Sequence, residues 1–306
     1  MSDIIQLLPD HVANQIAAGE VVQRPASIVK ELLENAIDAG ATKIELIVEE
    51  AGRNLIKVAD NGSGMSETDA RMAFERHATS KIRTTEDIFH IATKGFRGEA
   101  LASIAAVAQV ELKTKKQDSE IGTVIYIEGG ELQFQEPAQT TEGAVFSVKN
   151  LFFNVPARRK FLKSNNIEFR HIIDEFQRVA LAHENLEFSL YHNDEVIFNL
   201  RKGSQMQRIV DIFGRKLHPL LVPIKEDLGW VKLNGFVGKP EAAKKSRGEQ
   251  FFFVNGRYFR SPYLNRAVQE AFEGLLQSNY SPSFFLYLEL DPEKIDVNIH
   301  PQKTEV

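Results

Sequence analysis

The polar residues between positions 25 and 39 are spaced in a way that could hold a metal ion beside a substrate. Four of them stand at positions i, i+3, i+4 and i+7, which share one face of a helix. They are Glu31, Glu34, Asn35 and Asp38. Three carboxylates on one face repel one another, and they lie toward the helix C-terminus, where negative charge is unfavourable. Such costs are typical of a cation site, and amide and carboxylate oxygens suit Mg²⁺ shared with substrate phosphates. A solvated acidic face is the alternative interpretation.

Two glycine-containing segments could hold the rest of a ligand. Residues 60–65 (DNGSGM) place an acid directly after a strand-like run, with two glycines that let the backbone approach a flat ligand closely. A plain turn is the alternative there. Residues 95–101 (GFRGEAL) place two glycines before a helical run, where backbone N–H groups and the helix dipole suit phosphate. The chain has no Walker A sequence and no Gly-x-Gly-x-x-Gly, which excludes the P-loop and Rossmann classes of nucleotide site.

The sequence also predicts the helix and strands that position these polar and glycine residues. Pro25 suits the first turn of a helix that ends near Ala39, and Gly40 suits the position just past its end. Strand-like runs follow at 43–50 and 55–59. This helix–strand–strand order favours an α+β sandwich, with helices on one side of a largely antiparallel sheet.

The remaining pattern completes the first half of the chain and predicts a second, smaller domain after it. The first half continues with a helix from about Glu99, strands at 122–127 and 144–148 and a helix at about 167–183. The boundary between the two domains is expected near 201–204. Beyond it, a hairpin is expected at 251–259, because Asn-Gly supplies the positive φ angles of a type I′ turn. A helix at 263–276 and a strand at 284–290 follow.

Charge is uneven along the chain. Residues 1–200 carry 21 basic and 30 acidic residues, a net of −9, whereas residues 201–306 carry 16 and 12, a net of +4. The stretch 239–266 alone has seven basic residues against two acidic ones, which makes it a candidate nucleic-acid surface. A solvated basic face is an equally open interpretation.

Composition excludes several classes of protein. The absence of cysteine excludes disulfides, Cys-ligated metal sites and thiol catalysis. The first basic residue is Arg24, so the start lacks the charged region of a secretory signal, and no apolar run is long enough for a membrane helix. We therefore expect a soluble, cytoplasmic protein that has no membrane partner.

The motifs taken together resemble those of a known ATPase family. Glu31-x-x-x-Asn35, Asp60-x-Gly62-x-Gly64 and the loop 95–98 resemble, in this order, the nucleotide site shared by gyrase B, the heat-shock chaperone of that class, sensor histidine kinases and MutL proteins. Five longer stretches, spread over almost the whole chain, are similar to the MutL family of DNA mismatch repair proteins specifically. They are 14–34 (NQIAAGEVVQRPASIVKELLE), 77–82 (HATSKI), 95–102 (GFRGEALA), 154–161 (NVPARRKF) and 296–306 (DVNIHPQKTEV).

The resemblance implies a role for each matching residue. Glu31 would be the general base for an attacking water, Asn35 would coordinate Mg²⁺, and Lys303 would reach the γ-phosphate of ATP. Asp60 would accept a hydrogen bond from the adenine amino group. The full set of implied nucleotide-binding residues is Asn35, Asp38, Asp60, Gly62, Gly64, Met65, Thr79, Ser80, Lys81, Gly95, Phe96, Arg97, Gly98, Glu99, Ala100 and Leu101.

The resemblance also implies a fold, domains and partners. We expect a Bergerat-type ATPase α/β sandwich over 1–201 and a ribosomal-protein-S5-like α+β domain over 202–306. ATP binding would drive dimerisation of two copies and clamping of DNA, and slow Mg²⁺-dependent hydrolysis would reset the state. The implied partners are DNA, the mismatch-recognition protein MutS and a downstream nuclease or helicase. The residues expected to contact DNA backbone are Lys244, Lys245, Arg247, Arg260 and Arg266.

Three points stay open. The family usually has Gly-Thr where this chain has Gly143-Ala144, so the hydroxyl that helps to fix adenine is missing, with Thr140, Thr141 or water as possible substitutes. Family members continue past Lys303 into a C-terminal dimerisation domain, sometimes with an endonuclease, which these 306 residues do not include. A nucleotide-gated binding module without significant turnover is the alternative function, and the basic residues Arg158, Arg159, Lys160 and Lys163 could contact DNA, a partner or only solvent.

Overall fold

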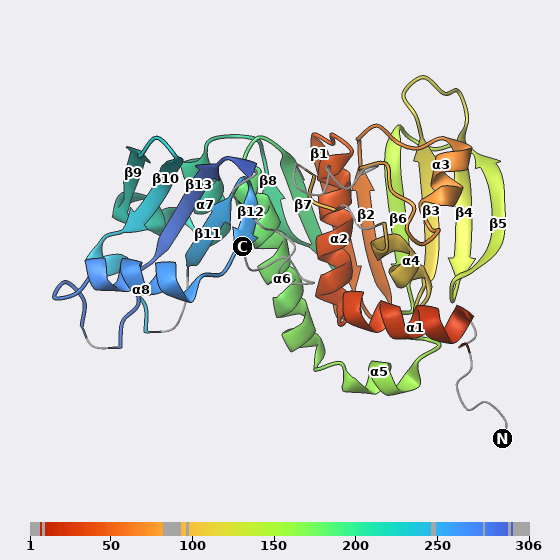
Figure 1. Cartoon of the computed structure of the whole chain (residues 1–306), viewed down its shortest axis with the longest axis horizontal. Helices are drawn as coiled ribbons and strands as arrows, with labels where there is room; N and C mark the ends of the chain where they lie inside the picture. Colours follow the sequence, from red (N-terminus) through yellow and green to blue (C-terminus); the bar gives the residue numbers. More distant parts are fainter. Residues whose placement is uncertain are drawn as a thin grey trace. The chain divides into compact units, whose positions relative to one another are not determined.

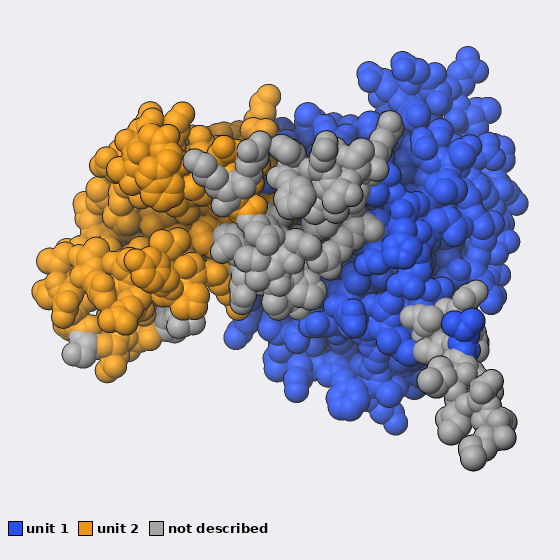
Figure 2. All heavy atoms as spheres, in the orientation of Figure 1, with its two compact units in different colours: residues 1–83, 93–176, 186–199 blue, residues 84–92, 177–185, 200–306 orange. Residues whose placement is uncertain are grey.

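The computed structural model describes residues 7, 10–81, 93–95, 98–245, 249–277, 279–292 and 295, with only the backbone at 10–13. Figure 1 follows the chain from one end to the other, and Figure 2 marks two compact units in different colours. The described residues of the first unit fall within 1–83, 93–176 and 186–199. Those of the second unit fall within 177–185 and 200–306.

The first unit is built on an eight-stranded sheet of order β5-β4-β3-β6-β2-β1-β7-β8. Its strands are β1 Lys43–Glu49, β2 Leu55–Asp60, β3 Gln109–Lys115, β4 Gly122–Glu128, β5 Glu131–Ala138, β6 Gly143–Lys149, β7 Glu187–His192 and β8 Glu195–Leu200. Strands β1 and β7 pair in parallel, whereas β5-β4-β3-β6-β2-β1 pair antiparallel throughout. The prediction of a largely antiparallel sheet is therefore confirmed.

Helices cover this sheet and carry the polar residues singled out above. They are α1 Asp10–Val21, α2 Pro25–Asp38, α3 Glu67–Met72, α4 Ala100–Ala105, α5 Pro156–Phe161 and α6 Asn165–Ala182, with a short 3-10 turn η1 at Glu50–Gly52. Figure 1 shows α1, α2 and α4 in front of the sheet.

Helix α2 is held by its apolar face. It begins at Pro25 after the extended residue Arg24 and is followed by Gly40, whose φ is +74°. Ile28, Val29 and their apolar neighbours on the same face are fully buried. Burial of each such side chain contributes about 1.5–3 kcal/mol, which fixes the opposite, polar face of the helix in place.

The second unit holds a five-stranded sheet of order β12-β11-β13-β10-β9. Its elements are α7 Gln205–Phe213, η3 Arg215–Leu220, β9 Leu221–Asp227, β10 Val231–Gly238, η4 Pro240–Ala242, β11 Gln250–Val254, β12 Arg257–Phe259, α8 Pro262–Ala271 and β13 Phe284–Leu290. Its core gathers buried aromatic and aliphatic side chains from this sheet, α7 and the end of α6. They include Leu181, Ile209, Phe253, Phe285 and Tyr287.

Most elements predicted from the pattern are present, and one helix is shorter than predicted. The hairpin turn has positive φ at both Asn255 (47°) and Gly256 (74°), as the Asn-Gly signal requires. The helix predicted over 263–276 ends at Ala271 in α8. The apolar pattern continues through Leu275, but Gly274 has a φ of +78° and the chain turns there instead.

Candidate functional site

The polar face of α2 is narrower than its spacing predicts. Asn35 and Asp38 lie on one side of the helix together with Glu31, and all three residues are partly buried. Glu34 departs from that prediction because it is 9% exposed and belongs to the buried residues of the helix. Two of the three carboxylates on the predicted polar face, those of Glu34 and Asp38, are therefore largely buried.

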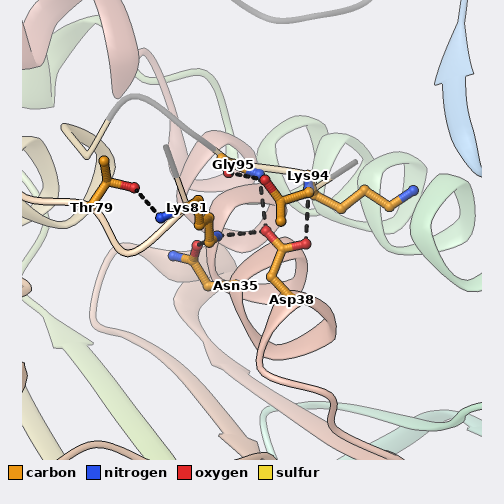
Figure 3. Close-up of polar contacts among 7 residues, drawn as sticks. Asn35, Asp38, Thr79, Lys81, Lys94 and Gly95 are labelled. Carbon is orange, nitrogen blue, oxygen red and sulfur yellow. Dashed lines mark hydrogen bonds and ion pairs between the residues drawn. The ribbon is translucent and has the colours of Figure 1, made fainter. Parts of the chain in front are cut away.

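Asp38 joins three separate segments (Figure 3). Its side chain is 7% exposed, and Oδ2 accepts from the Lys81 ammonium at 2.5 Å. Oδ1 accepts from the backbone N–H of Lys94 at 2.8 Å, and Oδ2 also accepts from the N–H of Gly95 at 3.0 Å. One buried carboxylate on α2 therefore holds both the 79–81 segment and the glycine loop that begins at residue 95.

Asn35, Lys81 and Gly95 form a small cradle beside the Asp38 carboxylate. The Lys81 ammonium is 3.4 Å from Asn35 Oδ1, while Thr79 Oγ1 accepts from the Lys81 backbone N–H at 3.2 Å. A Cβ added at Gly95 would lie 3.3 Å from Lys81 Nζ and 3.6 Å from Asn35 Oδ1. The missing side chain at Gly95 leaves room beside an ammonium and an amide oxygen, which suits a phosphate with its metal ion.

Asp60 ends β2 and is oriented by two backbone groups. Its Oδ1 accepts from the N–H of Gly62 at 2.8 Å, and the N–H of Ala144 also stabilises the carboxylate. Burial raises the pKa of Asp60 above its ordinary value, and these two hydrogen bonds oppose that shift without reversing it. A buried carboxylate held from one side by backbone donors can accept a further hydrogen bond from a ligand.

The loop after Asp60 is attached to the C-terminal end of α2. The N–H of Ser63 donates to the carbonyl of Ala39 at 2.9 Å, and a Cβ at Gly62 would lie 2.8 Å from that carbonyl oxygen. Gly64 has a φ of +62°, and a Cβ there would lie 2.1 Å from the Lys115 carbonyl oxygen. Both glycines are required by close backbone approach. Gly62 brings the Asp60 loop against the end of the helix that carries Asn35 and Asp38, and Gly64 brings the loop against Lys115 of β3.

Thr114 also belongs to this region, although its sequence context did not single it out. Its hydroxyl accepts from the N–H of Met65 at 2.9 Å and donates to the carbonyl of Gly143 at 2.7 Å. The residue is completely buried in β3. A lone threonine in a strand carries no sequence signal, because only the pairing of β3 with β6 brings it to this place.

The 77–81 segment contacts Gly98, the last residue of the loop 95–98. The N–H of His77 donates to the Gly98 carbonyl at 3.1 Å, and a Cβ at Gly98 would lie 2.4 Å from the Ala78 carbonyl oxygen. Glu99 precedes α4, which contains Ala100 and Leu101. Of the other predicted site residues, Ser80 is exposed, and Phe96, Arg97 and Lys303 lie outside the described residues.

The basic residues predicted to contact DNA have different surroundings in the second unit. Lys244 forms an ion pair with Glu249, which is 6% exposed and also accepts from the Ser283 hydroxyl. Arg266 pairs with Glu270 on the exposed face of α8 at 2.8 Å. Lys245 lies 5.8 Å from the centre of the Tyr280 ring. Arg260 Nε is 3.4 Å from the Tyr258 hydroxyl, and Arg247 lies outside the described residues.

Arg158 has a structural position in the first unit. Its guanidinium donates to the carbonyls of Gly19 and Val22 at the end of α1 and lies 4.5 Å from the centre of the Phe152 ring. Burial lowers the pKa of Arg158. The sequence left DNA, a partner or solvent open for the basic residues of this segment. Arg158 instead holds the turn that leads from α1 into α2, where a cation suits the helix end.

Within the described ranges, no three acidic or histidine side chains gather closely enough to hold a metal ion by themselves. Over the same ranges, no helix has the combination of length and apolar character needed to cross a membrane.

Comparison with known proteins gives consistent matches over the chain. Residues 23–142 match the family model described as histidine kinase-, DNA gyrase B-, and HSP90-like ATPase. Residues 209–306 match the model for the C-terminal domain of DNA mismatch repair proteins.

Two relatives are named DNA mismatch repair protein MutL. The protein from Christiangramia forsetii is 63% identical over all 306 residues, which cover 50% of its own length. The protein from Flavobacterium psychrophilum is 64% identical with the same coverage. The chain thus spans about half the length of the curated relatives it matches.

Solved structures agree with these matches. The Aquifex aeolicus MutL ATPase domain complexed with ADP has a TM-score of 0.67 at 26% identity, covering 89% of this chain and 94% of that one. A crystal structure of the N-terminal domain of a DNA repair protein has a TM-score of 0.82 at 25% identity, covering 95% and 91%.

Proposed function

We propose that this chain, which belongs to the MutL family of DNA mismatch repair proteins, binds ATP with Mg²⁺ in its first unit and hydrolyses it slowly. One observation carries the proposal: two sets of residues meet at the C-terminal end of α2. The set around Asp38 suits phosphates, and the set around Asp60 suits a base. The solved relative that is complexed with ADP supports nucleotide binding by this chain.

The adenine end of the site would be read by Asp60. Its carboxylate, held by the N–H groups of Gly62 and Ala144, would accept a hydrogen bond from the adenine amino group. Guanine presents a carbonyl at that position, so two acceptors would face each other without a proton between them. An unmade buried hydrogen bond costs about 1–3 kcal/mol, which corresponds to roughly a 5- to 150-fold preference for ATP over GTP.

The phosphate end would be held by the cradle of Asn35, Lys81 and Gly95. The Asn35 amide oxygen is the protein ligand that would hold Mg²⁺, and its neighbour Lys81 supplies a positive charge beside it. The donor set fits this use, since one protein oxygen leaves the other ligand positions to phosphates and water. The bound ion would neutralise charge on the phosphates during transfer.

Hydrolysis would depend on Glu31, which lies one helical turn before Asn35 on the same side of α2. Its carboxylate would orient a water molecule and take one of its protons as the water oxygen bonds to the γ-phosphorus. The bond from that phosphorus to the bridging oxygen breaks, which leaves ADP and inorganic phosphate. Lys303, outside the described residues, would contact the γ-phosphate and link its presence to the second unit.

The wider role would be that of a switch. ATP would bring two copies of this region together to clamp DNA, and hydrolysis would release them, which couples mismatch recognition by MutS to a downstream nuclease or helicase. Two domains would share this work, an ATPase domain over 1–201 and a transducer domain over 202–306. The division of the chain into compact units between residues 199 and 200 supports a boundary there.

The DNA surface would lie on the second unit and contact backbone phosphates without reading sequence. The net charge of +4 over residues 201–306 and the exposed lysine and arginine side chains support this placement. Binding of this kind weakens steeply with salt, because each neutralised phosphate releases counterions.

The proposal is tested by equilibrium binding of ATP and GTP to this chain with and without Mg²⁺, together with release of phosphate from each nucleotide. We expect Mg²⁺-dependent turnover of ATP and a preference for ATP within the range given above. Equal affinity for ATP and GTP would contradict the role of Asp60. Tight ATP binding with no phosphate release would instead favour the second candidate, a nucleotide-gated binding module.

A further inference from the structure

The row of residues that crosses the sheet at Asp60 contains one hydroxyl, and it stands on an unexpected strand. Asp60 of β2 pairs with Ala144 of β6, and Ala144 pairs with Thr114 of β3. Directly opposed residues of antiparallel strands point to the same face, so these three side chains form one line across the sheet. Ala144 has no hydroxyl to offer beside Asp60, and Thr114 lies one strand further on.

Thr114 acts on Asp60 through a single peptide group. Its hydroxyl donates to the carbonyl of Gly143 at 2.7 Å, and the same peptide unit carries the N–H of Ala144 that stabilises the Asp60 carboxylate. The chain of contacts therefore runs from hydroxyl to carbonyl, and from the N–H of the same peptide to the carboxylate. Hydrogen bonds in such a chain polarise one another, and the peptide cannot rotate without breaking both.

The same hydroxyl fixes the other side of the Asp60 loop. It accepts from the N–H of Met65 at 2.9 Å, directly after Gly64, where a Cβ would lie 2.1 Å from the Lys115 carbonyl oxygen. Gly143 is equally confined, with a φ of +97° and room for no Cβ, which would lie 2.1 Å from the Asp60 carbonyl oxygen. Thr114 is completely buried, so it does not itself reach a ligand.

We infer that Thr114 is a positioning residue for the base end of the site, which sets the preference for adenine by holding the Gly143–Ala144 peptide and Met65 around the Asp60 carboxylate. The inference rests on the proposed function, because it assigns Thr114 a task in ATP recognition. The Thr114 hydroxyl of β3 thus supports Asp60 through the Gly143–Ala144 peptide, whereas a threonine at position 144 would act on the base end of the site directly.

Thr123 offers a matched control. It is 4% exposed, lies directly opposite Thr114 on β4, and donates its hydroxyl to the Glu136 carbonyl of β5 at 3.2 Å, away from the Asp60 loop. Substitution of either threonine by Val removes one buried hydroxyl at nearly unchanged volume. A general loss of sheet stability should therefore appear in both variants, whereas a loss of base recognition should appear in only one.

The experiment measures the dissociation constants of ATP and GTP for the unmodified chain and for Thr114→Val, Thr114→Ser and Thr123→Val, with the unfolding midpoint of each. We expect the ATP preference to fall about five- to hundred-fold in Thr114→Val, and to stay within twofold of the unmodified chain in Thr114→Ser and Thr123→Val. If Thr114→Val does not fold, Thr114→Ala is compared with Thr114→Ser in the same way.

Two outcomes overturn the inference, and they are distinct from failure of the proposed function. One is an unchanged ATP preference in Thr114→Val. The other is an equal loss of ATP and GTP affinity in Thr114→Val and Thr123→Val, which would mean that the hydroxyl only stabilises the sheet. If the unmodified chain binds no ATP, the proposed function fails and the inference fails with it.

Discussion

Removal of the Asp38 carboxylate should destabilise the first unit more than removal of the Lys81 ammonium. Asp38→Ala leaves three donors without their acceptor, namely the Lys81 ammonium and the backbone N–H groups of Lys94 and Gly95. Loss of one partner of a buried, hydrogen-bonded ion costs about 3–5 kcal/mol. Lys81→Met leaves the carboxylate with its two backbone donors, so we expect a smaller loss of about 1.5–3 kcal/mol.

The direct interaction is isolated by a double-mutant cycle on these two residues. Guanidinium unfolding followed by circular dichroism gives the free energy of unfolding of the unmodified chain, both single variants and the double variant. Because the two side chains are only 7% and 20% exposed, we expect a coupling of about 1.5–3 kcal/mol. Nucleotide affinity should fall in parallel, since Asp38 holds the glycine loop at Gly95.

An exposed ion pair in the same unit is the control. Lys116 and Asp69 lie 3.6 Å apart with 49% and 62% of their side chains exposed, so their coupling should stay below about 1 kcal/mol. A coupling of Asp38 with Lys81 no larger than this control would mean that the buried pair stabilises the unit no more than an exposed one does. Equal losses from Asp38→Ala and Lys81→Met would show that the two backbone donors contribute nothing.

Three further predictions concern other parts of the chain. Arg158→Ala should lower the free energy of unfolding by about 1–3 kcal/mol, because two carbonyls at the end of α1 lose their donor. Arg159 is exposed, so Arg159→Ala should change the free energy of unfolding by less than about 0.5 kcal/mol. Equal losses in the unfolding curves of the two variants would exclude the contact of Arg158 with α1. Burial raises the pKa of Asp60, so the folded chain holds the proton of this carboxyl group more tightly than the unfolded chain does. The contribution of this protonation to the free energy of unfolding is present below the unfolded pKa and is lost as pH rises through the folded pKa. The ratio of GTP to ATP dissociation constants should accordingly fall toward one as pH drops through that raised pKa, and Asp60→Asn should show no such transition. Lys245→Ala should weaken DNA binding and reduce the slope of the logarithm of the binding constant against the logarithm of the salt concentration by about 0.9. Lys244→Ala should have a smaller effect, since the Lys244 ammonium is paired with a buried carboxylate. Equal slopes of the two variants in a salt titration would contradict this order.

Local signals in the sequence predicted the elements that carry their own start and stop residues. Helix α2 has Pro25 at its beginning and Gly40 after its end, and the β11–β12 hairpin has Asn255-Gly256 at its turn. Helix α1 was not predicted, because Asn14 and Gly19 weaken its local preference. Its C-terminal end is held instead by Arg158, more than 130 residues away in the chain, and such tertiary support leaves no local pattern.

The candidate site divides in the same way. Spacing alone placed Asn35 and Asp38 together on one helix face, because that relation is local. Lys81 and Gly95 reach Asp38 across 43 and 57 positions, so their meeting depends on the fold. Thr114 entered the site only through the register of β3 with β6. The same spacing placed Glu34 on the polar face, but Glu34 is 9% exposed and belongs to the buried residues of α2.

The most direct test of the central claim compares the unmodified chain with Glu31→Ala under saturating ATP and Mg²⁺, with ATP affinity and phosphate release measured on the same samples. A general base contributes about 10²- to 10⁴-fold to rate, so we expect a loss of turnover in that range with ATP affinity changed by no more than a few-fold. Phosphate release by Glu31→Ala at the rate of the unmodified chain would contradict the account, because the carboxylate on α2 would then have no part in the reaction.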